Sequence, residues 1–523
     1  MTKKVYKGLR VFLFIAGGLF LLLVIFNIIL NQKIEGKLKD IFSTAIPGTG
    51  ITFSSASANV FTRAVSLSDV HVLYFGAQQN KYRHEFILPR VTLKGIHVFS
   101  WWLENNFIVN KISIGDGSVS LDKTLLQDTS VADSVVVFPF NEFAAGSFEM
   151  KNMDVRVHSA TTDEISWKGN LTTVNIKRDK KEDFRFEEFK CELQGLKYYL
   201  PGSHKTISVK RLIVRSKESY ALLDSITCTS DFPKEEFSKK VGFQSDWLHL
   251  VIDSVSLKGL DVTSLFNNKM HAAVMMIYKS EAEIYRDRRF PMRPVIKELP
   301  VEMLKTISQD IRVDTIAIEP STITYEEFPE EGLKSGVIRM ENTTASVYNL
   351  CNHPGDADSG HITMNAQTSL MGSGLFTQTI YLPLKQGENY STKGSIKNLD
   401  LTRLNSSAEN FGLIHIESGI LNELAFEFSF NEKNATGILT GDYNNLKVDK
   451  LKMDENKKLK KAAIKTMLER AFVIPENKDK NIPLSKRTGK IDANYDPTRF
   501  TSFYIMSAIL SGIRSSFVLG FLI

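Results

Sequence analysis

The stretch that decides the fold is VTLKGIHV, residues 91–98, because its apolar residues fall out of step halfway along. Val91 and Leu93 alternate with polar residues, as in a β-strand that has one apolar face. The next apolar residue, Ile96, comes three positions later, and a strict two-residue period would turn it to the opposite face. The slip therefore needs a local backbone feature that an ordinary strand lacks.

The same slip recurs along the chain. Each copy of the motif is apolar at its third, sixth and eighth positions, and usually at its first. The copies are VSLSDVHV (65–72), VTLKGIHV (91–98), FEMKNMDV (148–155), CELQGLKY (191–198), ISVKRLIV (207–214), VSLKGLDV (255–262), GSIKNLDL (394–401) and GDYNNLKV (441–448). Such repetition indicates a quasi-repetitive β array rather than a set of compact independent domains.

The fifth position of the motif accounts for the slip. Every copy but one has Gly, Asn or Asp there, and these residues tolerate a positive φ. A β-bulge built on such a residue would keep the apolar residues on both sides of it on one face. A tight turn is the competing interpretation, because turns favour the same residues. The fifth residues are Asp69, Gly95, Asn152, Gly195, Arg211, Gly259, Asn398 and Asn445.

The composition fits a folded β protein. The 523 residues are 43% hydrophobic and 24% charged, which excludes a disordered chain. A net charge of +6 without a basic stripe argues against nucleic acid as a partner. We expect a mainly β fold, in which residues 51–450 form an elongated, bulged antiparallel repeat sheet with a curved hydrophobic groove. Periodicity alone leaves a closed sandwich open as the alternative.

The N-terminus predicts a membrane anchor. Residues 11–30 are apolar except for one asparagine, and a helix of this length spans a bilayer core of ~30 Å. The run continues into a linker, residues 31–50, without a small-residue cleavage site, which argues against a removed signal peptide. The basic segment 1–10 should stay in the cytoplasm by the positive-inside rule, with the bulk of the chain across the membrane.

The C-terminal part predicts two amphipathic helices. The first is basic and covers residues 455–474; residues 475–499 are expected to be a linker. The second, residues 500–523, has one charge and a helical apolar spacing typical of a membrane interface, although a helix that caps a soluble core is the alternative. The residues expected to contact a membrane are Trp101, Trp102, Phe503, Leu510, Ile513 and Phe517.

Sequence motifs of enzyme chemistry are missing. The chain has no GxSxG, HExxH or P-loop pattern. The densest group of metal-ligand types is CNHPGDADSGH, residues 351–361, but its proline and glycines indicate a loop and its spacing matches no standard site. Cys191, Cys228 and Cys351 lie too far apart in sequence for a metal or disulfide motif. We expect no catalytic residue, no metal site and no cofactor.

The predicted anchor followed by repeated V-x-L-x-G-L-x-V strands resembles the AsmA-like proteins of Gram-negative bacteria. That family includes TamB-type relatives and is similar to the bridge-like lipid transfer proteins. Residues 313–350 resemble a strand–turn–strand unit of its Bacteroidota members, residues 414–448 their C-terminal signature, and residues 507–516 their terminal helix. The last residues of that signature are Gly437, Gly441, Tyr443 and Leu446.

The resemblance implies a single-pass protein of the inner membrane with a periplasmic β-groove. It also implies a role in phospholipid transport between the inner and outer membranes and in outer-membrane biogenesis. The partners implied are a phospholipid or another acyl-chain lipid, the inner membrane through residues 11–30, and an outer membrane or a partner protein through the C-terminal helix. This chain is shorter than the large members, so we expect it to bridge the periplasm with a partner or to act as an accessory.

The candidates for lining the groove are apolar residues of the repeated motif and of LAFEFSF, residues 424–430. Ordinary core packing is the alternative role for each. The candidates are Val91, Leu93, Ile96, Val98, Val255, Leu257, Leu260, Leu424, Phe426, Phe428 and Phe430. Two other functions fit the same pattern: a non-enzymatic assembly factor that presents a sheet edge to outer-membrane proteins, and a membrane-tethered β-sandwich that binds a glycan or a protein.

Overall fold

The computed structural model is mainly β, with 67% strand and 12% helix, which confirms the predicted class. It describes residues 49–59, 61–74, 84–97, 100, 103–122, 141–159, 162–179, 185–200, 202–293, 295–332, 334–353, 360–385, 387–453, 459–461 and 488–517. The expected anchor, residues 11–30, lies outside these ranges. No helix within them is both long and apolar enough to cross a membrane.

The chain divides into two units, and the first comprises residues up to Tyr199 together with Ser208–Glu218. In it, β4 pairs antiparallel with β3 and with both β5 and β6, and β7 pairs with β8. Its strands are β1 (Thr49–Thr52), β2 (Ser55–Asn59), β3 (Ala64–Tyr74), β4 (His84–Lys94), β5 (Phe107–Gly115), β6 (Ser118–Asp122), β7 (Glu142–Ser159), β8 (Thr162–Asp179), β9 (Glu188–Leu200) and most of β10 (Lys205–Arg215).

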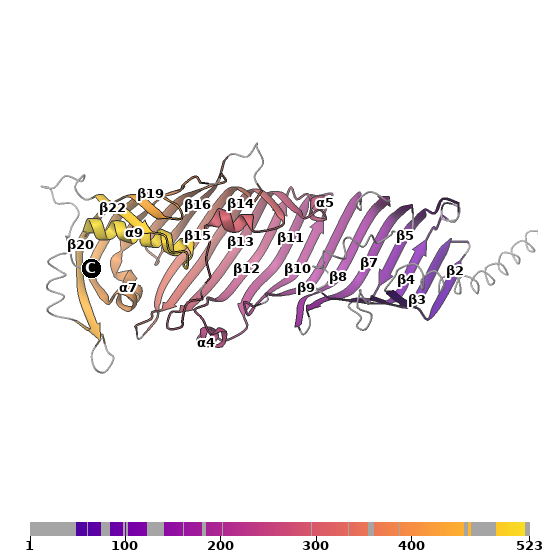
Figure 1. The fold of residues 1–523 in the computed structure, drawn as a ribbon, viewed down its shortest axis with the longest axis horizontal. Helices are drawn as coiled ribbons and strands as arrows, with labels where there is room; N and C mark the ends of the chain where they lie inside the picture. The colour runs from indigo at the N-terminus through magenta and orange to yellow at the C-terminus, as the bar shows by residue number, and fades with distance from the viewer. Residues whose placement is uncertain are drawn as a thin grey trace, which may run out of the picture. The chain divides into compact units, whose positions relative to one another are not determined.

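The second unit comprises Leu200–Ile207 and the chain from Ser219 onward. Its strands lie side by side in chain order from β11 to β20 (Figure 1). They are β11 (Tyr220–Ser230), β12 (Trp247–Lys258), β13 (Lys269–Asp287), β14 (Asp310–Phe328), β15 (Gly336–Cys351), β16 (His361–Leu370), β17 (Gly374–Pro383), β18 (Tyr390–Asp400), β19 (Ile414–Phe430), β20 (Asn434–Met453), β21 (Leu459–Lys461) and β22 (Thr488–Asn494).

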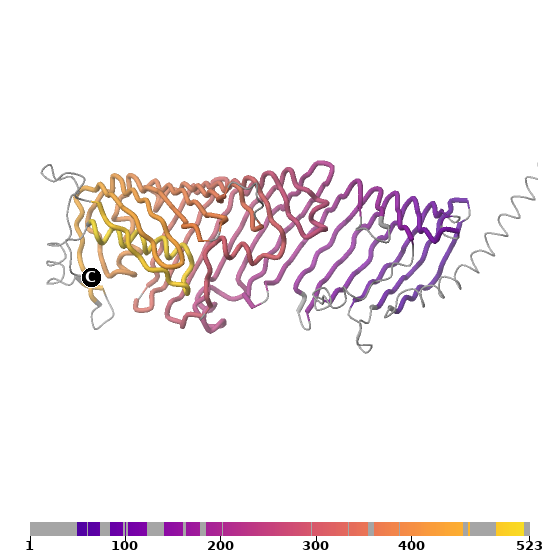
Figure 2. The backbone as a smooth tube through the Cα atoms, turned by 45° about the horizontal axis from the view of Figure 1, so that its top comes forward, coloured from indigo at the N-terminus to yellow at the C-terminus, as the bar shows by residue number. Residues whose placement is uncertain are grey.

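Short helices connect the strands of the second unit. A longer one, α9 (Thr501–Phe517), contacts β20 and β22, and it is the yellow helix in Figures 1 and 2. It confirms the helix predicted near the C-terminus. The others are α4 (Phe237–Val241), α5 (Val262–Leu265), α6 (Pro300–Lys305), η2 (Leu401–Leu404) and α7 (Asn405–Gly412).

The sheet is mixed, which corrects the expectation of an antiparallel one. β7 runs parallel to β5 and β6, and β14 runs parallel to β13. A parallel partner requires the chain to cross back before it pairs, and between β13 and β14 it does so through the segment that holds α6. Apolar alternation indicates which face of a strand is buried but not the direction of its neighbour, so the sequence could not reveal this.

Two of the predicted C-terminal segments also differ from the structure. The expected linker, residues 475–499, contains β22, which pairs with β20. Inside the expected helix 455–474, the described residues 459–461 form β21, paired with the end of the same long strand. Both strands are short, and β20 offers them unpaired backbone groups, so pairing with it overrides their local sequence pattern.

The fifth residue of the repeated motif has a positive φ in every copy except the one with Arg211. The values run from 51° at Asp69 to 68° at Gly95. The bulge interpretation is confirmed in β7, β9 and β20, where the pairing register shifts at Asn152, Gly195 and Asn445. The turn interpretation holds at Gly95 and at Gly259, where the strand ends.

A third outcome was not anticipated from the sequence. At Asp69 the pairing with β4 resumes without a register shift, because the partner strand slips as well, at Pro89. Leu67 and Val70, which flank Asp69, then pack in one cluster with Leu88 and Val91, which flank the partner's slip. The apolar face is therefore continuous across the slip on both strands.

Slips on neighbouring strands line up into a row that we call a crease. In the first unit the crease runs through Asp69, Pro89, Asp116 and Asn152, on β3, β4, the β5–β6 junction and β7. Within it, the Asn152 side-chain amide donates to an Asp116 carboxylate oxygen at 2.6 Å. In the second unit a matching crease runs through Ser225, Asp253, Lys279, Pro320 and Asn342.

The two units contain a duplicated module. The order β3–β4–β5/β6–β7–β8 of the first unit matches β11–β12–β13–β14–β15 of the second, with the parallel pair at the same place. The turns correspond as well: the Gly95 amide donates to the Arg63 carbonyl, and the Leu260 amide, one residue after Gly259, donates to the Ser219 carbonyl, both at 2.9 Å. Arg63 and Ser219 both have positive φ. The predicted repeat is thus a repeat of whole modules.

Replacement of Gly259 by alanine tests the turn. Alanine at a positive φ costs ~1 kcal/mol, and a Cβ here would also lie 2.7 Å from the Ala273 Cβ, which we expect to add about 1–3 kcal/mol. Gly202→Ala is the matched control, since Gly202 also has a positive φ but nothing lies within 4 Å of its added Cβ. Urea denaturation should show a clearly larger loss of unfolding free energy for Gly259→Ala. Equal losses would contradict the close packing of the turn.

Candidate functional site

The candidate site is the apolar face of the second unit. Residues directly opposite each other in a paired ladder point to the same side of a sheet, so the register assigns the members of this face. We define the apolar face as Leu250, Ile252, Val255 and Leu257 of β12, Met275 and Ile277 of β13, Ile316 and Ile318 of β14, Met340, Ala345 and Val347 of β15, Met364, Ala366 and Leu370 of β16, Phe376 and Ile380 of β17, and Leu424, Phe426 and Phe428 of β19.

The face is continuous across its crease. Leu370 pairs with Met340 on one side of Asn342, and Met364 pairs with Val347 on the other side. Leu370 and Val347 nevertheless pack against the same hydrophobic cluster. The left-handed residue therefore joins two stretches of apolar side chains that a regular strand would place on opposite sides.

One end of the apolar face is closed. Phe426 and Phe428 on β19 are 3% exposed, and Phe430, farther along the same strand, is 1% exposed. The Phe430 ring meets the Tyr504 ring of α9 edge-on, with centroids 5.8 Å apart. Burial raises the pKa of Tyr504 to about 12, as expected for a phenol inside this contact.

The other part of the face, over β12 to β16, is only partly covered, although Leu257 within it is buried. Leu250, Ile252, Met275 and Ile318 are only half-buried. Met364 is 36% exposed. A core residue of this size is normally buried from all sides, so these side chains still present apolar surface. The arrangement can therefore accept an apolar chain laid across the strands.

The predicted groove residues fall into three positions. Leu424, Phe426, Phe428 and Phe430 belong to the closed end, where they pack as a core. Val255 and Leu257 lie on the apolar face, and Leu260, beyond the Gly259 turn, is buried. In the first unit, Val91 packs against the cluster of Leu67 and Val70, whereas Leu93 and Ile96 join a neighbouring cluster with Val109. Val98 lies outside the described residues.

The predicted membrane-contacting residues divide between two sides of α9. Phe503 and Leu510 are exposed, at 44% and 42%. Ile513 packs inward against the hydrophobic cluster. Trp101 and Trp102 lie outside the described residues, and the side chain of Phe517 does too. The helix thus has a second apolar side that does not face the sheet, which the sequence spacing could not separate from the first.

A charged network marks one rim of the apolar face, and sequence reasoning missed it. Arg286, two residues beyond Ile284, donates two hydrogen bonds to the Asp246 carboxylate, each 2.7 Å long. The Tyr325 hydroxyl donates to Glu327 at 2.6 Å; burial and this carboxylate raise the pKa of the phenol far above its usual range. Burial, and then the nearby Arg286 charge, lower the pKa of the Lys297 ammonium. The rim therefore carries cations and carboxylates together, with Arg286 paired to Asp246 and Arg288 paired to Glu327.

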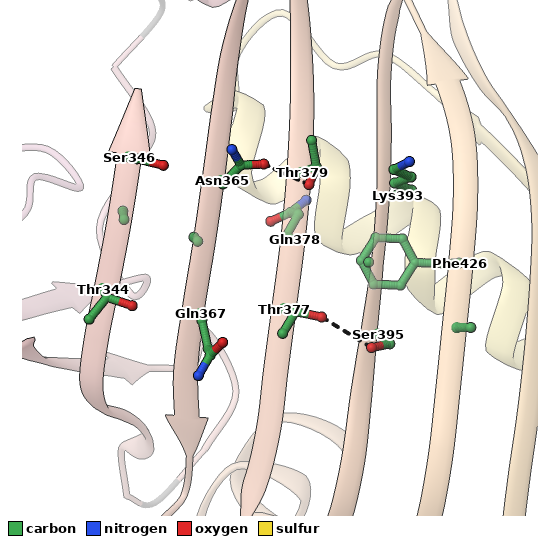
Figure 3. Close-up of a pocket in the computed structure, with 14 residues that line it drawn as sticks. Thr344, Ser346, Asn365, Gln367, Thr377, Gln378, Thr379, Lys393, Ser395 and Phe426 are labelled. Atoms are coloured by element: carbon green, nitrogen blue, oxygen red, sulfur yellow. Dashed lines mark hydrogen bonds between the residues drawn. The ribbon is translucent and has the colours of Figure 1, made fainter. Parts of the chain in front are cut away.

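A hollow of about 700 Å³ lies over β15 to β19 (Figure 3). Its polar lining residues, such as Asn365, Gln367 and Thr377, lie opposite one another in the strand pairing and point to the side of the sheet away from the apolar face, so the hollow does not belong to that face. Among the polar ones, the Thr379 hydroxyl donates to the Asn365 side-chain oxygen at 2.8 Å. Lys393 is the one charged residue of the lining. This composition can hold a ligand through van der Waals contacts and neutral hydrogen bonds.

Metal-ligating residues do not gather within the part of the chain that the structure describes. Cys351 of the expected loop is buried, and Asp356 and Asp358 lie outside the described residues. Burial raises the pKa of the Cys191 thiol to about 11, which leaves it protonated at neutral pH.

No family model matches the chain, and no curated protein matches it.

Gly512 tests how α9 closes the end of the face. A Cβ on Gly512 would lie 2.9 Å from both Ile491 and Leu439, so alanine should push the helix away from the sheet. Alanine in a helix normally stabilises it by ~1 kcal/mol relative to glycine, yet we expect Gly512→Ala to lower the free energy of unfolding. It should also accelerate hydrogen exchange in α9. Gly412→Ala in α7 is the control, since its nearest contact would be an ordinary 3.6 Å. Slower exchange in Gly512→Ala would refute this packing.

Proposed function

We propose that this protein binds the acyl chains of phospholipid, or of another acyl-chain lipid, along its partly exposed apolar face. In this proposal it takes part in lipid transport between the inner and outer membranes and in outer-membrane biogenesis. The predicted segment 11–30 would anchor it in the inner membrane with the sheet in the periplasm. It would act as a binding and transport protein rather than as an enzyme.

The observation that carries the proposal is the half-exposed state of the apolar face over β12 to β16. Burying apolar surface releases ~25 cal/mol for each Å², so a lipid chain that covers several half-buried Ile, Leu and Met side chains gains several kcal/mol. Side chains such as Ile252, Ile277 and Ile318 come from adjacent strands about 4.8 Å apart. An extended acyl chain that crosses the strands would contact one side chain after another.

The closed end supports the same proposal. At β19 to β22 the apolar face is covered by α9, and the aromatic residues there form a core. An apolar face that is covered by a helix at one end and exposed at the other is expected of a surface that holds a ligand, because the helix blocks the ligand from extending farther. A closed sandwich would be expected to bury the middle strands as fully as it buries Phe426 and Phe428.

Two adjacent methionines of β13 provide a matched test. Met275 lies on the apolar face, Met276 lies on the opposite face, and both are half-buried. We expect Met275→Gln to reduce the lipid that copurifies with the full chain, because an amide placed against an acyl chain loses its hydration. Met276→Gln should leave the lipid content unchanged. The measurement is mass spectrometry of lipid per protein after purification in a mild detergent.

The proposal fails if the wild-type chain carries no lipid. It fails equally if the two glutamine variants lose lipid to the same extent while both remain folded. In either case the apolar face would have to be assigned to protein packing instead.

A further inference from the structure

An exposed apolar loop lies beside α9. Val295 and Ile296, between β13 and α6, are 47% and 75% exposed, although two adjacent branched apolar residues normally lie in a core. Arg293 precedes them and Lys297 follows them, so the apolar tip is flanked by cations. No sequence motif had singled out this loop.

The loop is fixed to the segment that leads into α9. The Lys297 amide donates to the Pro497 carbonyl at 2.7 Å, and the Tyr495 hydroxyl donates to the Lys297 carbonyl. The Lys297 ammonium also lies 3.5 Å from the centre of the Phe500 ring. These contacts hold the tip of the loop next to the start of α9.

The outer side of α9 repeats the same chemistry. Phe503, Met506 and Leu510 form an exposed stripe at helical spacing, 44%, 49% and 42% exposed. Arg499 lies one turn before the stripe, with its guanidinium 4.9 Å from the Phe503 ring, and Arg514 lies one turn after it. Loop and helix therefore each present apolar side chains bracketed by basic ones.

The charges of this surface favour an anionic partner. Arg293 and Lys297 take part in no ion pair within the residues that the structure describes, whereas the neighbouring Arg286 and Arg288 are each paired with a carboxylate. Three acidic residues are nearby. Glu298 and Glu432 are exposed, and Asp496 lies 3.9 Å from Arg499 and accepts hydrogen bonds from Thr498.

We propose that Arg293, Val295, Ile296 and Lys297, together with the outer side of α9, form one docking surface for an anionic lipid bilayer. The apolar side chains enter the boundary between headgroups and acyl chains, and the flanking cations meet the headgroup phosphates. A protein partner would be expected to offer a complementary pocket, whereas a bilayer accepts a projecting tip and a parallel helical stripe together. The occupant is therefore assigned as the membrane surface.

Docking of this kind deepens the proposed lipid-binding function without depending on it. Phe500 contacts Arg286 as well as Lys297, and Arg286 marks the rim of the apolar face next to Ile284. A bilayer held at the docking surface would thus lie close to that rim. A lipid leaving the bilayer there could pass its headgroup along the charged rim while its chains reach the apolar face.

Tryptophan fluorescence tests the docking in the full chain. Ile296→Trp places a reporter at the loop tip, and Ile438→Trp is the matched control, because Ile438 is 55% exposed on the side of β20 away from α9. Each protein is reconstituted into vesicles of phosphatidylcholine and phosphatidylglycerol, with or without bromine on the acyl chains. We expect brominated lipid to quench the emission added by Ile296→Trp and to leave that added by Ile438→Trp unchanged.

Equal quenching of the two reporters would overturn the proposal, and would leave the surface to a protein partner. Adding Arg293→Gln and Lys297→Gln to the Ile296→Trp chain should reduce the quenching in vesicles that contain phosphatidylglycerol. Quenching that is unaffected by these changes would contradict the headgroup contacts. Quenching of tryptophan emission is measured independently of the lipid that copurifies with the chain. The docking proposal can therefore fail while the lipid-binding proposal holds, and the lipid-binding proposal can fail while docking holds.

Discussion

The structure depends on one backbone constraint: a residue with positive φ placed within or at the end of a strand. A strand alternates strictly between its two faces, so a sequence that moves its apolar residues by three positions can keep them together only if one residue leaves the β region. Asn, Asp and Gly leave it at the lowest conformational cost. Because neighbouring strands slip in the same row, the backbone pairing continues while the apolar face stays whole, as at Asp69 and Pro89.

This constraint links the fold to the proposed function. The crease in the second unit keeps the apolar side chains of β12 to β16 on one surface, and many of them stay partly accessible. The same surface becomes a core where α9 covers it near Phe428 and Phe430. Apolar side chains of the same face thus form a core at one end and stay available to a ligand at the other. The difference is that α9 covers the sheet at only one end.

The sequence predicts the local backbone conformation of the repeated motif. The type of the fifth residue predicts the positive φ at Asn152 and Gly259. Arg211, which has neither the flexibility of Gly nor the side chain of Asn, has no positive φ. Slips without that residue type went unnoticed, such as Lys279, because tertiary pairing imposes them. The direction of β14, the packing of Phe430 against α9, and the Arg286–Asp246 rim all depend on contacts between residues far apart in the chain. A single sequence carries no signal for such contacts.

Site-specific photocrosslinking tests the central claim most directly. A photoreactive residue at position 318, on the apolar face of β14, is compared with one at position 317, which points to the other side of the same strand. The account predicts that, in the full chain within its native membranes, position 318 crosslinks to lipid and position 317 does not. Crosslinking of lipid at neither position, or equally at both, would contradict it.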